Sequence, residues 1–93
     1  MTLRTKFLRH SISWKKSAEK DLLSIPDANT KDIKEKVEKI VQDDPTLDII
    51  RLQGSFNLPT YRLRVGNYRV IFEDHKDEII ILIVAVKHRK DAY

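Results

Sequence analysis

The sequence predicts an α+β fold, in which an N-terminal strand and a helical hairpin pack on a mostly antiparallel sheet that ends in a three-strand meander. Two alternating runs flank the two-residue turn Gly66-Asn67, as a tight β-hairpin requires. A β-branched run at 78–86 is typical of a buried strand. Before residue 45, two segments repeat apolar residues at helical spacing. This order of elements is typical of an α+β domain, which we expect to span residues 1–93.

The opening strand is expected at residues 8–14. Leu8, Ile12 and Trp14 alternate, with His10 on the same face, although Trp14 could equally begin the next helix. The first helix follows, because Ala18, Leu22 and Ile25 share one helical face until Pro26 stops the pattern.

A second helix is predicted from Asp27, its expected N-cap, to the stop Asp43-Asp44-Pro45. Its apolar stripe consists of Ile33, Val37, Ile40 and Val41. The short connection between the two helices predicts an antiparallel helical hairpin that needs a sheet to cover its stripe. Residues 47–59 show no period and predict a connecting loop, in which Ile49, Ile50 and Phe56 are expected to form a short apolar anchor.

The hairpin is expected to pair 60–65 with 68–73, placing Arg64 opposite Arg69. Alternation then sorts the side chains. One face, directed at the helices, carries Tyr61, Leu63, Val65, Tyr68, Val70 and Phe72, and the open face carries Arg62, Arg64 and Arg69. After a turn at 74–77, the strand 78–86 is expected to be central and buried on both faces, and 87–93 to form a polar basic tail.

Three arginines on one open face suggest an anion site. Directly opposed like charges cost roughly 0.2–1 kcal/mol per cross-strand pair, so the arrangement needs a reason. The planar donors of arginine suit phosphate, either in a nucleic-acid backbone or in a developing phosphoryl charge. The alternative is a solvated sheet face balanced by Glu73 and other acids.

The tail is expected to emerge near the hairpin and adds Lys87, His88, Arg89, Lys90 and Tyr93. His88 has the unperturbed pKa best suited to proton transfer near neutrality. Tyr93 could stack on a base, or exchange a proton if neighbouring cations lowered its pKa. The alternative is a frayed, charged chain end.

Composition narrows the class of protein. The net charge of +4 favours anionic partners, and residues 51–93 hold eight Lys/Arg against five Asp/Glu. The absence of cysteine excludes disulfides and thiolate metal sites, and we expect no metal, no cofactor and no membrane association. His10 and His75 are isolated, which suggests surface or structural roles. No signal peptide or spanning segment is expected, which favours the cytoplasm.

Four segments together resemble the RelE/ParE toxin superfamily, and its RelE branch most closely. They are 18–22 (AEKDL), 52–54 (LQG), 61–73 (YRLRVGNYRVIFE) and 86–93 (VKHRKDAY). The resemblance covers nearly the whole chain, and the hairpin and closing segment are its specific parts. It implies a ribosome-dependent endoribonuclease that cuts mRNA in the A site by internal transesterification from the ribose 2′-oxygen, together with a RelB-like antitoxin partner.

The resemblance also implies residue roles. Arg62 and Arg64 resemble the family's basic pair on the first hairpin strand, Arg69 resembles the arginine after the turn, and Arg89 and Tyr93 resemble the late arginine and terminal aromatic. The expected catalytic set is therefore Arg62, Arg64, Arg69, His88, Arg89 and Tyr93, with RNA contacts from Arg62, Arg64, Lys87 and Lys90. The first pair is often lysine in the family, and arginine cannot act as a base. We expect the hairpin arginines to stabilise the phosphate while Tyr93, His88, water or a ribosomal group moves the proton.

Two alternatives remain open from the sequence. A ParE-like toxin shares the fold and poisons DNA gyrase. A non-catalytic member would bind only RNA, the ribosome or its antitoxin.

Overall fold

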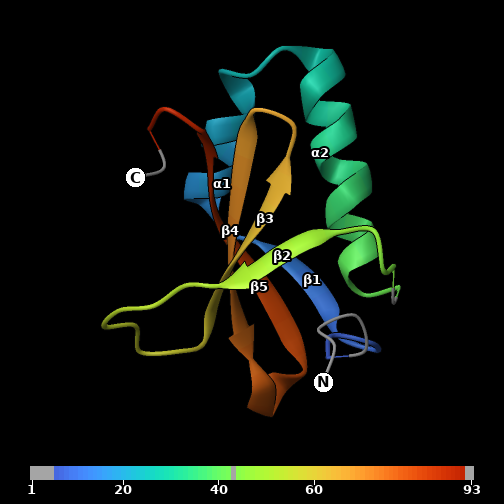
Figure 1. Ribbon diagram of the computed structural model, residues 1–93, viewed down its shortest axis with the longest axis vertical. Helices are drawn as coiled ribbons and strands as arrows, with labels where there is room; N and C mark the ends of the chain where they lie inside the picture. The colour runs from blue at the N-terminus through green and yellow to red at the C-terminus, as the bar shows by residue number, and fades with distance from the viewer. Residues whose placement is uncertain (1–5, 43, 92–93) are drawn as a thin grey trace.

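In the computed structural model, which describes residues 6–42 and 44–91, a five-stranded sheet has the order β1-β5-β4-β3-β2 (Figure 1). The β1–β5 pairing is parallel and the other pairings are antiparallel. The mostly antiparallel α+β fold is therefore confirmed. The elements are β1 Ser11–Trp14, α1 Lys16–Leu23, α2 Asp27–Ile40, β2 Asp48–Arg51, β3 Thr60–Val65, β4 Tyr68–His75, the 3₁₀ turn η2 Lys76–Glu78 and β5 Ile80–His88.

The β3–β4 hairpin has the predicted register. Val65 pairs with Tyr68 and Arg64 with Arg69, so two residues form the turn. Gly66 has a φ of +57°, in the left-handed region that glycine adopts without a steric penalty. Because side chains alternate along both strands, this turn determines which residues face the helices.

The expected loop at 47–59 is partly wrong, because Asp48–Arg51 forms β2 along the outer edge of β3. Four residues are too few for a period to be visible in the sequence. Ile49 packs against the core as an anchor, whereas Ile50 and Phe56 are about half exposed and do not serve as anchors.

The predicted end of the last strand is also wrong, because β5 continues through Lys87 and His88. These residues pair with Arg69 and Tyr68, so they belong to the sheet and not to a tail. The pairing of β4 with β5 shifts in register between Ile71 and Phe72. The side chains of β5 therefore do not alternate regularly between the two faces along the whole strand. β5 is an interior strand, but only its helix-facing side is fully buried, since both helices of the described residues lie on that one side of the sheet.

The opening strand is shorter than the expected 8–14. Leu8 is 45% exposed and lies in a turn before β1, where Arg9 has a φ of 73°. Phe7, which the alternating pattern missed, is completely buried. His10 has a structural role, because its Nε2 lies 3.2 Å from Oδ1 of the buried Asp74.

The predicted helix boundaries need two corrections. Asp27 is the first residue of α2 and Pro26 occupies the N-cap position without a side-chain cap, so Asp27 is not the cap. Its negative charge in the first turn still interacts favourably with the dipole of α2. α1 ends at Leu23, before Ile25.

At the predicted helix stop, Asp44 accepts hydrogen bonds from the hydroxyl and backbone N–H of Thr46 at 2.6 and 2.8 Å. These bonds hold the pKa of the Asp44 carboxyl below its ordinary value. Asp43 lies outside the described residues.

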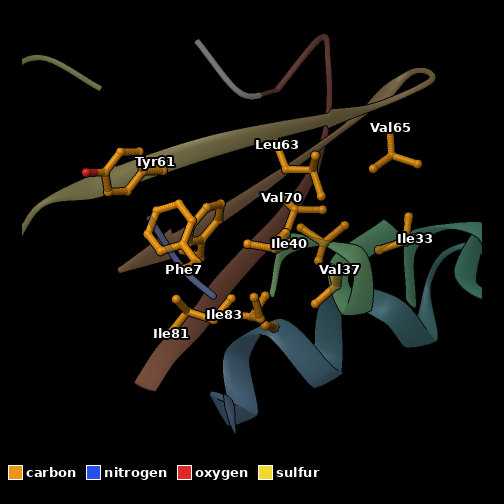
Figure 2. Close-up of a cluster of buried hydrophobic side chains, with 13 residues drawn as sticks. Phe7, Ile33, Val37, Ile40, Tyr61, Leu63, Val65, Val70, Ile81 and Ile83 are labelled. Atoms are coloured by element: carbon orange, nitrogen blue, oxygen red, sulfur yellow. The ribbon is translucent and has the colours of Figure 1, made fainter. Parts of the chain in front are cut away.

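The core lies between the sheet and the two helices (Figure 2). α1 packs on β5 and α2 on β3, with Ala18, Ile33 and Val37 buried against the sheet. At one end, the ring of Phe7 makes T-shaped contacts with the rings of Tyr61 and Phe72 at centroid distances of 5.1 and 5.4 Å. Within the described ranges, no helix is long and apolar enough to cross a membrane.

Truncation of Phe7 tests this aromatic cluster. Phe7→Ala should lower the free energy of unfolding by about 3–5 kcal/mol, as expected for loss of a buried aromatic side chain. Urea denaturation measures the change. The matched control is Leu8→Ala, which removes a half-exposed neighbour and should cost much less. Equal losses in the two variants would contradict the core position of Phe7.

Candidate nucleic-acid interface

The sheet face turned away from the helices carries a row of cations across three strands. Arg64 on β3 pairs with Arg69 on β4, which pairs with Lys87 on β5. We call Arg64, Arg69 and Lys87 the basic row. Like charges at directly opposed positions destabilise a sheet, so the row is held together by the remainder of the fold.

Arg62 lies on the same face, one row away, between Ile50 and Ile71. Its Nη2 donates to Oδ1 of Asp48 at 2.9 Å, across the β2–β3 pairing. The Arg62 side chain is 13% exposed, whereas Asp48 is 51% exposed. An acidic residue from the unpredicted strand β2 therefore partly neutralises one of the predicted arginines.

Arg69 is more buried than an open sheet face suggests, with only 8% of its surface exposed. Its Nη1 donates to the carbonyl oxygens of Gly66 and Tyr68, both at 3.0 Å. Its Nε is buried without a hydrogen-bond partner among the described residues. Arg69 therefore braces the hairpin turn, and its guanidinium retains an unused donor.

Arg64 and Lys87 are the exposed members of the basic row. Arg64 makes no hydrogen bond or ion pair with the part of the chain that the structure describes. Lys87 lies 3.8 Å from Oδ1 of Asp21 on α1. An incoming anion would meet these two side chains on either side of Arg69.

His88 lies on the helix-facing side of the sheet, because it pairs with Tyr68 and follows Lys87. Its ring meets the Tyr68 ring edge-on, with centroids 5.5 Å apart. Its Nδ1 is within 3.2 Å of the backbone N–H of Lys90, which can donate to it. The structure therefore separates His88 from the basic row.

The segment after β5 returns to the hairpin. The N–H of Arg89 donates to the Asn67 carbonyl at 2.7 Å, which places Arg89 beside the turn. Lys90 is exposed next to it. Tyr93 lies outside the described residues.

Ser17 and Asp21 make contacts with β5 that the sequence patterns did not reveal. Ser17 Oγ donates to the Val84 carbonyl, and an Asp21 carboxylate oxygen accepts from the Val86 N–H, both at 2.8 Å. Their spacing of four residues is a helical signal, but only the packing of α1 beside β5 shows its use.

Two other features lie apart from the basic row. A groove of about 800 Å³ runs between α1 and α2, lined in part by Trp14, Leu22, Leu23 and Val37. Within residues 6–42 and 44–91, no group of three or more His, Asp or Glu side chains could hold a metal ion. The lining of the groove includes none of the basic-row residues, so the candidate interface is separate from it.

Comparison with known proteins gives consistent matches. A family model described as the ParE toxin of the type II toxin-antitoxin system parDE matches residues 12–93. Toxin RelE3 of Methanocaldococcus jannaschii is 40% identical over 78 residues, covering 80% of this chain and 84% of the relative. RelE1 of the same organism is 33% identical over 89 residues, covering 92% of this chain and 97% of the relative. The RelB-RelE antitoxin-toxin complex of Methanococcus jannaschii contains a chain with a TM-score of 0.70 and 34% identity, covering 87% of this chain and 94% of that chain.

The different burial of the two opposed arginines is testable by stability. Arg69→Ala should lower the free energy of unfolding by about 1–3 kcal/mol, because it removes charge-assisted bonds to the turn. Arg64→Ala, the control on the facing strand, should change it by less than about 0.5 kcal/mol, since it removes an exposed side chain. Urea denaturation measures both, and a larger loss in Arg64→Ala would contradict the bracing role of Arg69.

Proposed function

Because the chain belongs to the RelE/ParE family of type II toxin-antitoxin toxins, we propose that it is a ribosome-dependent endoribonuclease that cuts mRNA in the A site. Family membership makes it a RelE-like toxin. The finer activity is supported above all by the basic row, which presents cations to an anion on an uncovered sheet face. Inhibition of translation would follow, with the cytoplasm as the place of action.

The proposed reaction is a transesterification within the RNA. The ribose 2′-oxygen attacks the adjacent phosphorus, the bond to the 5′-oxygen breaks, and a 2′,3′-cyclic phosphate is left. Negative charge gathers on the phosphate oxygens in the transition state. Arg64 and Lys87, with Arg62 beside them, are placed to stabilise this charge, and the positive charge of the buried Arg69 lies between them. These residues supply charge directly, so the proposal invokes no metal or cofactor.

Two protons must move in this reaction, one from the 2′-hydroxyl and one to the leaving 5′-oxygen. The guanidinium groups cannot accept a proton at physiological pH. Among the candidates His88, Tyr93, water and a ribosomal group, His88 is the least favoured, since its ring lies across the sheet from the basic row. We therefore assign proton transfer to the other three. Arg89 stays in the proposed catalytic set and Lys90 stays a proposed RNA contact, and both lie near the turn.

The partner that silences the toxin is a RelB-like antitoxin, as in the RelB-RelE complexes to which this chain is similar. An acidic antitoxin segment over the basic row would neutralise the opposed cations and exclude RNA from the same surface.

Inhibition of DNA gyrase is the second candidate, because the matching family model is named for the ParE toxin. The named relatives and the RelB-RelE structures favour the RelE branch instead. Gyrase-dependent DNA breaks with intact mRNA would support the ParE branch.

Mapping fragment ends on programmed ribosomes tests the proposal. Antitoxin-free protein should cut a defined mRNA within the A-site codon, and only when ribosomes are present. Arg64→Ala should lower kcat/KM by about 10²-fold, since it removes exposed charge without a stabilising contact. The control Lys31→Ala removes an exposed lysine from α2 and should cut at the wild-type rate. Absence of cleavage by folded protein would reject the proposal.

The position of His88 makes a separate prediction. His88→Gln should keep cleavage within about threefold of wild type, whereas loss of a general acid or base would cost roughly 10²–10⁴-fold. Single-turnover cleavage on the same ribosomes measures this. A loss in the larger range would return His88 to the catalytic set.

A further inference from the structure

α1 completes the hydrogen bonding of β5 where β1 ends. β1 stops at Trp14, opposite Ile83, and the backbone N–H of Lys15 still donates to the Ile83 carbonyl at 2.9 Å. Beyond Ile83, no strand of the described residues pairs with that edge of β5. Ser17 then binds the carbonyl of Val84, and Asp21 binds the N–H of Val86. Side chains of α1 thus serve the backbone groups that another strand would otherwise pair.

The Asp21 carboxylate contacts two consecutive residues of β5 with its two oxygens. Oδ2 accepts from the Val86 N–H at 2.8 Å, and Oδ1 lies 3.8 Å from Nζ of Lys87. The Asp21 side chain is 23% exposed and that of Lys87 is 47% exposed. A part-buried acid therefore holds the strand and faces the cation that ends the basic row.

An ion pair so open to water contributes little to stability, so stability alone does not account for its place. Near an RNA-binding surface, a carboxylate also weakens the attraction of the lysine for phosphate. Asp21 weakens the attraction of Lys87 for RNA, yet it holds β5 and lies beside Lys87. Its presence is therefore better explained by a role in placing the Lys87 ammonium than by a contribution to RNA affinity.

We propose that Asp21 is a positioning residue, which holds the end of β5 through Val86 and keeps the Lys87 ammonium in line with Arg64 and Arg69. This inference rests on the proposed function. Asp21 itself touches no RNA in this role. Its charge lowers affinity for RNA but places Lys87 where charge develops on the phosphate.

Two substitutions separate the two contacts of Asp21. In Asp21→Asn, the amide oxygen can still accept from Val86, while the charge facing Lys87 is lost. In Asp21→Ala, both contacts are lost. Glu19→Gln is the control, because it removes an exposed acid from the same helix.

On programmed ribosomes, Asp21→Asn should lower kcat about fivefold and also lower KM about twofold, because the misplaced lysine binds RNA without stabilising the transition state. Partial unfolding of the variant would reduce the active fraction, and so the apparent kcat, but would leave KM unchanged. A fall in both kcat and KM therefore identifies a positioning role. Glu19→Gln should match wild type. In a Lys87→Ala background, Asp21→Asn should have no further effect on kcat.

Amide hydrogen exchange gives a readout that needs no cleavage. Asp21→Ala should raise the exchange rate of the Val86 N–H about tenfold, whereas Asp21→Asn should leave it protected. If the exchange rate of the Val86 N–H is unchanged in Asp21→Ala, Asp21 does not hold the end of β5 and the inference is wrong.

The kinetic outcomes separate this inference from the proposed function. The proposed function stands if the wild-type protein cleaves. The positioning role is then wrong if Asp21→Asn cleaves like wild type, or if it lowers kcat equally in the presence and absence of the Lys87 side chain. If wild type does not cleave, the proposed function is wrong and the role of Asp21 in the reaction falls with it. Val86 exchange then still reports whether Asp21 holds the strand.

Discussion

The two-residue turn at Gly66-Asn67 is the constraint on which the rest of the arrangement depends. It pairs Arg64 with Arg69, and alternation along β3 and β4 then places Leu63 and Val70 on the helix-facing side. A shift of one residue in register would turn the arginines into the core. The hydrophobic contacts that stabilise the helix-facing side therefore also hold like charges together on the other side.

Each cation of the open face has a different local environment. Arg62 has an acidic neighbour from β2, Arg69 is braced by turn carbonyls, and Lys87 faces Asp21. Arg64 alone among them is exposed without a hydrogen bond or ion pair to the described chain. Of the four positive charges on this face, that of Arg64 is therefore the most accessible to an anionic partner.

The sequence was sufficient to predict features that repeat over many residues. The hairpin register and the helical stripe of Ile33 and Val37 were predicted correctly because each period is sampled several times. β2 was missed because four residues carry too little pattern. The faces of Lys87 and His88 were hidden for another reason: the apolar run before them has no alternation, so the phase shift within β5 leaves no trace in it. The contact between Asp21 and β5 joins residues 65 positions apart, and no local pattern encodes it.

The opposed charges of the basic row have a consequence for the lifetime of the toxin. Their mutual repulsion raises the free energy of the uncovered chain, and an anionic partner lying on the row relieves it. A toxin covered by antitoxin or RNA should therefore resist unfolding better than a toxin released from both. The surface proposed to bind RNA would then also make the free toxin the form most readily lost to proteolysis, which would limit how long it persists after its antitoxin is gone.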